Sequence, residues 1–271
     1  MSVINTNVSA LFAQNAMTKN SRAQGAAMEQ LSTGSRINSA KDDAAGLAIG
    51  QSMTTQVRGL NQAVRNLNDG VNMMQTAEGA LNETSNMLQR MRELAVQAAS
   101  GTYSASQRGY LDTEFQALSA QITKVSTQTK WNDQSLLTTA TNFVFQAGKD
   151  NLQTITATIN DMSIVGLTVT AAISVATVAG SALAITALDL AIGTVNTQRA
   201  SIGASINQMT YAVDNLSNVS ANASASRSSI MDTDYATAST QLSKTQIIQQ
   251  AATAMLAQAN QQPQSVLALL K

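Results

Sequence analysis

The sequence predicts a mainly α-helical protein in which long antiparallel helical rods form a coiled-coil-like bundle. A small β-hairpin region is expected in the middle, and terminal helical arms are expected to pair. Apolar residues recur at every seventh position over two long stretches, one in each half of the chain. Aromatic residues make up only 3% of the chain, which is too few for an ordinary globular core. The thin seams of a helical rod tolerate such a composition.

The first rod is predicted from about Ala44 to Ser100, followed by Gly101 as the residue that ends it. Its two apolar rows alternate at spacings of three and four, which is typical of a helix that buries one narrow seam against a partner helix. The main row is Met53, Leu60, Leu67, Met74, Leu81, Leu88 and Ala95, and the companion row starts with Val57, Val64 and Val71. The companion row continues as Glu78, Ser85 and Arg92, so this side is expected to face outward or to meet a polar partner.

The partner of the first rod is predicted near the other end of the chain. The same seven-residue period returns there with a matching length. Its main row is Leu188, Val195, Ile202, Met209, Leu216, Ala223 and Ile230, with Ile192, Ile206 and Val213 in the companion row. Two rods of equal period joined by a long middle segment predict an antiparallel pair.

Composition excludes several classes of function. The chain has no His and no Cys, so it offers no imidazole base, no thiol nucleophile, no disulfide and no zinc site of the common kind. We therefore expect no enzyme activity, no catalytic residue, no cofactor and no metal site. Asp232 and Asp234 lack further ligands nearby and are interpreted as solvated or capping groups. Sixteen basic residues balance sixteen acidic ones, which gives no net field toward nucleic acid or an anionic membrane.

The two ends of the chain are almost free of charge. Residues 1–18 carry no charged side chain, and Lys244 is the only charge between Asp234 and Lys271. Both ends are nevertheless helix-like, with apolar residues near one face: Val8 and Leu11 in the first arm, and Leu242, Ile248 and Met255 in the second. A surface helix normally has a charged outer face. The arms are either frayed tails or helices that become buried among neighbouring molecules, and we favour burial in an assembly.

Local signals define the segments next to the first rod. Asp42 and Asp43 lie where the N-terminus of the rod would favour negative charge. Ser104 and Gln107 form a possible capping box after the rod. The short amphipathic helix that it opens carries Leu111, Phe115, Leu118, Ile122 and Val125 on one face.

In the middle of the chain the apolar period changes to two. Phe143 and Phe145, a turn at residues 148–151, and then Ile155, Ala157 and Ile159 predict a hairpin. The run from Met162 to Leu188 is uncharged and long enough for a membrane span. Its apolar residues alternate from Val165 through Ala171 to Val175, which favours a half-buried strand, and the helical pattern resumes by about Ala184. The Ser/Thr-rich residues 138–181 either carry O-linked glycans or are unmodified polar residues in contact with water.

These signals divide the chain into five parts. They are an N-terminal arm and bridge (1–43), the N-terminal half of the rod bundle (44–141), a short hairpin and strand insert (142–183), the C-terminal half of the bundle (184–231) and a C-terminal arm (232–271). The opening residues show no cleaved secretory signal.

Several motifs in this order resemble those of bacterial flagellins. They are Ile4–Asn7 at the start, residues 30–46 (QLSTGSRINSAKDDAAG), residues 88–97 (LQRMRELAVQ), residues 196–200 (NTQRA) and the closing residues 266–271 (VLALLK). The resemblance covers roughly the first 140 and the last 85 residues. Only residues 142–183 separate the two matching parts, so the chain resembles a short flagellin that lacks large outer domains.

The resemblance implies a structural subunit of the flagellar filament that is used for swimming motility. In this family the terminal arms form the inner coiled-coil layer of a hollow filament, and the rod bundle forms the surrounding layer. The implied partners are copies of the same chain in a head-to-tail, non-closing assembly, an export chaperone on the C-terminal arm, and the filament cap and hook-junction proteins. Export is implied through the flagellar type III route, to an extracellular location, with no insertion into a membrane.

The resemblance also implies recognition by the vertebrate Toll-like receptor 5. Arg90, Leu94 and Gln97 share one face of the predicted rod, next to Gln89, and Glu114 on the following helix can come alongside. The alternative is that this face packs against the next subunit, and the two roles are compatible.

Three other readings remain open at this point. A hook-filament junction-type axial protein would share the terminal arms. A non-polymeric coiled-coil adaptor would explain the rods but not the uncharged ends. A membrane-anchored receptor or a secreted enzyme would need either a spanning helix or a catalytic cluster.

Overall fold

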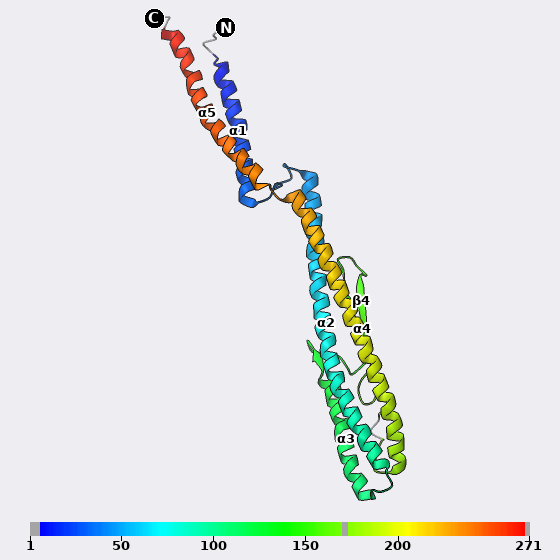
Figure 1. The fold of residues 1–271 in the computed structure, drawn as a ribbon. Coiled ribbons are helices and arrows are strands. Elements are labelled where there is room, and N and C mark those ends of the chain that lie inside the picture. The colour runs from blue at the N-terminus through cyan, green and yellow to red at the C-terminus, as the bar shows by residue number, and fades with distance from the viewer. Residues whose placement is uncertain (1–5, 170–172, 269–271) are drawn as a thin grey trace. The chain divides into compact units, whose positions relative to one another are not determined.

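The computed structural model describes residues 6–169 and 173–268 and is mainly helical, as predicted (Figure 1). The helices are α1 (Val8–Thr33), α2 (Ala44–Ala99), α3 (Ala105–Gln128), α4 (Val178–Met231) and α5 (Tyr235–Ala268). The strands are β1 (Lys130–Trp131), β2 (Gln134–Ser135), β3 (Thr141–Gln146) and β4 (Thr154–Ile159). The chain divides into a rod unit, Arg58–Ser220, and an arm unit made of Met1–Val57 and Ala221–Lys271.

In the rod unit, α2 and α4 lie side by side and antiparallel (Figure 1). The Ser220 hydroxyl donates to Asn61 Oδ1 at 2.8 Å, and further along α2 Arg92 Nε donates to Asp189 Oδ1 at 2.6 Å. The residue numbers rise along α2 as they fall along α4, which confirms the predicted antiparallel pair.

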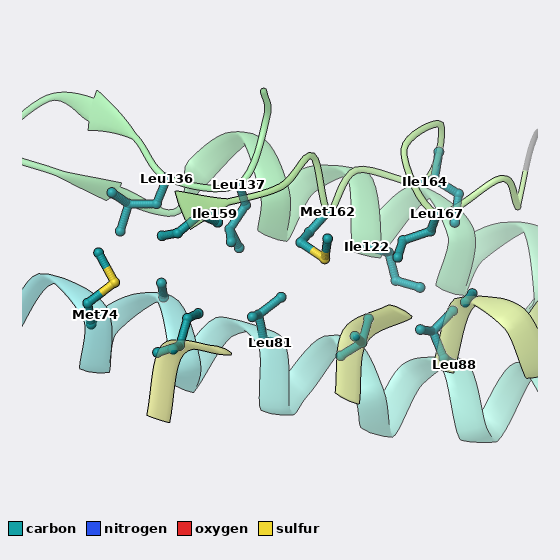
Figure 2. Packing of buried hydrophobic residues seen from close by; sticks show 14 of the residues in the cluster. Met74, Leu81, Leu88, Ile122, Leu136, Leu137, Ile159, Met162, Ile164 and Leu167 are labelled. Carbon is teal, nitrogen blue, oxygen red and sulfur yellow. The ribbon is translucent and has the colours of Figure 1, made fainter. Parts of the chain in front are cut away.

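The apolar rows of the two helices form the core of the rod unit. Their buried members, which lie in one cluster, are Leu60, Leu67, Met74, Leu81, Leu88 and Ala95 from α2 and Leu188, Val195, Ile202, Met209 and Leu216 from α4. Figure 2 shows Met74, Leu81 and Leu88 facing side chains of the middle segment and of α3, including Met162 and Ile122. Each such side chain contributes about 1.5–3 kcal/mol when it is fully buried. Met53, Ala223 and Ile230 belong to the arm unit and are half-buried there.

The polar row of α2 is less exposed than predicted. Ser85 is buried and Glu78 is half-buried, while Arg92 meets a polar partner in Asp189. The cause is that α3 and the described residues 162–169 and 173–175 add side chains to the same cluster. The sequence of one helix reveals its heptad row but not which other segments pack against it. The predicted outward orientation was therefore wrong for Ser85.

Helix ends follow local side-chain chemistry. The capping box is confirmed, because Ser104 Oγ accepts from Gln107 N at 3.3 Å and Gln107 Oε1 accepts from Ser104 N at 2.9 Å. Asp43 accepts from Gly46 N at the start of α2, whereas Asp42 binds the backbone and hydroxyl of Ser39. Gly34 ends α1 in the left-handed conformation with φ 70°.

Gly101 does not have the role that was predicted for it. Gly34 is the glycine with positive φ among the residues that the structure describes, so Gly101 is not a left-handed cap. Instead, Ser100 N donates to Gln97 O at 3.2 Å, which tightens the last turn of α2.

Two hairpins follow α3. The predicted hairpin is confirmed as β3–β4, with Phe143 opposite Ala157 and Phe145 opposite Ile155. The β1–β2 hairpin was not predicted. Its two-residue turn is Asn132–Asp133, both with positive φ, which is the turn type that matches the twist of two strands and that Asn and Asp tolerate.

The β3–β4 hairpin packs on α2 where α2 carries glycine. A Cβ atom at Gly59 would lie 3.1 Å from Lys149 Cβ in the hairpin turn. A Cβ atom at Gly70 would lie 2.9 Å from Phe145 Cδ1 and 3.1 Å from Met209 Sδ of α4. At the end of β4, buried Gln198 of α4 donates to Thr158 O at 2.9 Å and accepts from Asn160 N at 3.2 Å. The hairpin is therefore held by both long helices.

The strand that was predicted between Val165 and Val175 is wrong for the residues that are described there. Residues 163–169 form turns instead, because Leu167 N donates to Ser163 O and Val169 N donates to Ile164 O within the segment. Val165 is exposed, whereas Leu167 and Val169 are buried. Asp161 and Ser163 accept from backbone N–H groups at residues 163 and 166 and so favour the turns. Ala171 lies outside the described residues.

Helix α4 begins at Val178, earlier than the predicted Ala184. The Thr177 hydroxyl accepts from Gly180 N at 3.0 Å, which is N-cap chemistry that the sequence analysis did not identify. Within the described chain, α4 is the one helix long and apolar enough to cross a membrane by length and composition. Part of its apolar side lies in the core of the rod unit.

Candidate functional site

The arm unit is built on an antiparallel pairing of α1 with α5 (Figure 1). Asn20 Nδ2 donates to Thr245 O at 2.8 Å and to Gln249 Oε1 at 3.1 Å, and Asn7 Nδ2 donates to Ala259 O at 2.8 Å. The buried residues between the helices are small or polar: Asn20, Ala27, Ala238 and Thr245. No large side chain is fully buried among the described residues of these two helices, so they use little of their apolar surface against each other.

The larger apolar side chains of the arms are left at the surface. Of the predicted assembly residues, Val8, Leu11, Ile248 and Met255 are exposed, and Leu242 is half-buried. Phe12 and Ile247 are also exposed, at 70% and 66%, and neither was predicted as an assembly residue. They lie next to residues of the predicted stripe, so a search for one narrow face excluded them. The described arms thus expose apolar surface on more than one side.

The loop between α1 and α2 is attached to the junction of α4 and α5. Arg36 N donates to Met231 O at 2.7 Å, and Thr233 N donates to Gly34 O at 3.0 Å. The Arg36 guanidinium also donates to Ile230 O at 2.7 Å. These bonds fix the end of the arm unit where α1 ends and α5 begins.

The second candidate surface surrounds Arg90, near the C-terminal end of α2. Arg90 donates to Glu114 of α3 at 2.9 Å and to Glu93 at 3.1 Å. Hydrogen bonds to the two carboxylates raise the pKa of Arg90 above its ordinary value, and the bond to Glu114 has the larger effect. Gln89 and Gln97 are exposed, and Gln97 donates to the Tyr103 hydroxyl at 3.0 Å. The structure therefore brings Arg90 and Glu114 together on an exposed surface.

Leu94 is not part of this exposed surface. It is 1% exposed and lies in the core cluster with Phe115 of α3. Residues four apart on a helix differ by about 40° in direction, which is enough to place Arg90 outside and Leu94 inside once α3 covers α2. Glu93 was not predicted as part of this surface, although its spacing of three from Arg90 is a usual one for a helical ion pair.

Another exposed ion pair joins the two long helices. The Arg92 guanidinium beside Asp189 holds the pKa of that carboxyl below its usual value. Both side chains are about half exposed, so the pair fixes the register of α2 and α4 more than it stabilises the fold.

Asp232 and Asp234 were interpreted from the sequence as solvated or capping groups. Within the described residues there is no group of three or more acidic residues that could hold a metal ion. Asp232 accepts from the Ser228 hydroxyl, and Asp234 accepts from Ala236 N and the Thr237 hydroxyl at the start of α5. Both aspartates therefore bind local groups.

Comparison with known families identifies the chain. The model described as the bacterial flagellin N-terminal helical region matches residues 4–142, and the model of the bacterial flagellin C-terminal helical region matches residues 185–270. The chain belongs to the bacterial flagellin family. It is therefore a structural subunit that polymerises into the flagellar filament, which is extracellular.

Individual relatives support the same assignment. A flagellin of Halalkalibacterium halodurans is 41% identical over 271 residues, which cover 99% of this chain and 100% of that protein. The flagellar filament 33 kDa core protein of Treponema phagedenis is 38% identical over 290 residues, and the match covers 99% of this chain and 100% of that protein. The crystal structure of Bacillus cereus flagellin matches 56% of this chain and 88% of that chain, with 31% identity and a TM-score of 0.51. The full-length matches to the first two relatives support a short flagellin.

Proposed function

We propose that this flagellin assembles head-to-tail through its terminal arms, α1 and α5. The observation that carries the proposal is the exposed apolar surface of the arm unit, which includes Leu11, Phe12 and Met255. Scattered apolar residues are normal on a surface, but these residues lie on helices that carry almost no charge. Such helices are poorly solvated when they stand alone.

Burial of this apolar surface in an assembly contributes favourable free energy. Ordering a chain segment costs about 1–2 kcal/mol per residue in backbone entropy. The contacts between α1 and α5 bury mainly small and polar side chains, so they offset little of that cost. Burial of Leu11, Phe12, Ile247 and Met255 against neighbouring copies adds the missing apolar area. A contact of this kind between different surfaces does not close on itself and generates a helical fibre.

Replacing exposed apolar residues of the arms with glutamine tests this proposal. We expect monomers with Leu11→Gln, Phe12→Gln and Ile248→Gln to elongate wild-type filament seeds at least about tenfold more slowly, because each lost apolar contact weakens docking by about 1 kcal/mol or more. Filament length in electron micrographs at fixed times measures the rate. The control is Leu152→Gln, which changes an exposed leucine in the hairpin turn of the rod unit. Wild-type elongation by the triple variant would refute the role of the arms.

The same experiment separates the remaining alternatives. A non-polymeric coiled-coil adaptor does not elongate seeds. A hook-filament junction-type protein adds to the end of a filament and does not extend it. We also propose that the chain has no enzyme activity, because its sequence has no His and no Cys and because flagellins are structural proteins.

We also propose that the monomer is recognised by Toll-like receptor 5 through the surface around Arg90. Gln89, Arg90, Gln97 and Glu114 supply this surface, and Leu94 supports it from the core. The support is a guanidinium that Glu93 and Glu114 hold in one orientation on a rigid helix pair. A pre-organised arginine loses little side-chain entropy on binding and is a common interface anchor.

Arg90→Asp tests the receptor proposal. Reporter-cell signalling is expected to fall at least about tenfold, which corresponds to the loss of one interface anchor. The fold should survive, because an exposed ion pair contributes at most about 1 kcal/mol. Lys124→Asp, which makes the same change of charge at an exposed residue of α3, is the control. Undiminished signalling by the Arg90→Asp monomer would contradict the proposal.

Export through the flagellar type III route, a chaperone on the C-terminal arm, and docking to the cap and hook-junction proteins remain proposals. They are supported by membership of the flagellin family and by the exposed α5 surface, which is available to a partner before assembly.

A further inference from the structure

The charges of the arm unit are segregated along α1 and α5. From residue 6 to 28 and from 235 to 261 the only charged side chains are Lys19, Arg22 and Lys244. All three are exposed, and none has a carboxylate within ion-pair distance among the described residues. We call these three residues the basic belt.

The pairing of α1 with α5 brings the belt together at one level. Lys19 precedes Asn20 and Lys244 precedes Thr245, and Asn20 binds the Thr245 carbonyl at 2.8 Å. One residue corresponds to about 100° around a helix. Because the helices are antiparallel, an equal rotation away from their contact carries both lysines to the same side of the pair. Arg22 lies one turn from Lys19 on the neighbouring part of that side.

The opposite charge collects at the end of the arm unit where α1 ends and α5 begins. The carboxylates there are Glu29, Asp42, Asp43, Asp232 and Asp234. Arg36, Lys41 and Arg227 are the cations of the same region, which therefore has five carboxylates and three cations. Hydrogen bonds from Thr237 and Ala236 lower the pKa of Asp234, so it stays ionised well below neutral pH. We call this region the acidic base.

Burial of the arms in an assembly removes the cations of the basic belt from water, and a second copy can supply the anions that pair with them. A cation that is removed from water without a partner carries a large desolvation penalty. The described part of the arm pair holds no anion near the belt, so the partner must come from another molecule if the belt is buried. Matched surfaces of opposite charge also fix register and speed association.

From this arrangement we propose that the basic belt of one copy docks against the acidic base of the next copy in the filament. The contact is head-to-tail by construction, because the belt and the base lie at different levels of the same arm unit. The inference rests on the proposed assembly through the arms and adds to it the charges that set the register.

Neutralising each side tests the contact. The belt variant carries Lys19→Gln, Arg22→Gln and Lys244→Gln. The base variant carries Asp232→Asn and Asp234→Asn, because asparagine caps a helix about as well as aspartate and preserves the start of α5. The readout is the concentration of monomer left in solution after seeded assembly, measured by sedimentation at about 20 mM and about 300 mM NaCl, since salt screens such pairs.

At low salt each variant is expected to leave about tenfold more monomer in solution than wild type, which corresponds to about 1.4 kcal/mol. A chain with both sets of changes should be no worse than either variant, because both remove the same ion pairs. Wild-type solubility should rise with salt, while that of the belt variant should stay flat. Arg58→Gln, Lys124→Gln and Lys130→Gln in the rod unit give a control with the same loss of charge.

Three results would overturn the proposal. They are wild-type solubility of the belt variant at low salt, effects of belt and base that multiply in the combined chain, or an equal effect of the control. Wild-type solubility of the belt variant would show that the belt stays in solvent. Effects that multiply would show that the belt and the base bind separate partners. An equal effect of the control would show that only the net charge of the chain matters. Failure of the assembly proposal itself shows separately, as normal elongation by the Leu11, Phe12 and Ile248 variant.

Discussion

Leu81→Asp is expected to unfold the rod unit. Leu81 is fully buried on α2 and points toward Leu137 and Met162 (Figure 2). Loss of the leucine alone costs about 2.7–5 kcal/mol in comparable cores, and the aspartate adds an unpaired charge in an apolar site. The total approaches the whole stability of an ordinary domain, which is about 5–15 kcal/mol.

Trp131 makes this prediction easy to measure. It is the single tryptophan of the chain and packs against the core of the rod unit, so its fluorescence reports on that unit in urea titrations. The control is Leu152→Asp, which changes an 85% exposed leucine and should stay within about 0.5 kcal/mol of wild type. A folded Leu81→Asp variant with a native urea midpoint would show that the seam is not the core of this unit.

Gly70→Val is expected to destabilise the rod unit by about 2–3 kcal/mol. A Cβ atom at Gly70 already meets the Phe145 ring of the hairpin at 2.9 Å, and a valine adds two further methyl groups. The ring carbons are not the end of a flexible chain, because Phe145 lies opposite Ile155 in the β3–β4 hairpin. The hairpin must therefore move away from α2, and apolar contacts between them are lost.

Gly79 provides the matched control for Gly70. It lies on the same helix, and a Cβ atom there would meet nothing within 4 Å. Gly79→Val should leave stability unchanged or raise it slightly, since valine has a better helix propensity than glycine. Equal urea midpoints for the two variants, followed by Trp131 fluorescence, would show that the hairpin does not require close approach at Gly70.

Periodic features of this fold could be predicted because the sequence repeats them many times. The row from Met53 to Ala95 offers seven apolar positions in one register, so a single exception would not hide the seam. The β3–β4 hairpin has a similar redundancy, with Phe143, Phe145, Ile155, Ala157 and Ile159 alternating on two strands. The capping box has only two residues, but its hydrogen bonds are local and need no tertiary information.

Features that depend on contacts between distant segments could not be predicted. Residues 165–169 alternate like a strand, yet the segment bonds to itself in turns and joins the core beside α2 and α3. Leu94 was placed with Arg90 because one helix was considered alone, and packing of α3 buries it. Gly101 was predicted as a cap from its residue type, while a tightened last turn ends α2 without it.

The candidate surfaces divide in the same way. The absence of charge in the arms is a property of composition and could be read directly. The pairing of small and polar residues between α1 and α5, which leaves Phe12 and Ile247 exposed, depends on which faces meet and required the structure. The basic belt likewise becomes one surface only when Asn20 is placed against Thr245.

Negative-stain electron microscopy of seeded assembly by two chains tests most directly whether the terminal arms carry the assembly contacts. One is the full chain, and the other lacks residues 1–32 and 236–271, which removes most of α1 and α5 but keeps the rod unit. We predict filaments from the full chain and none from the trimmed chain, whose Trp131 fluorescence should remain native. Filaments of equal length and number from the trimmed chain would contradict the claim that the terminal arms carry the assembly contacts.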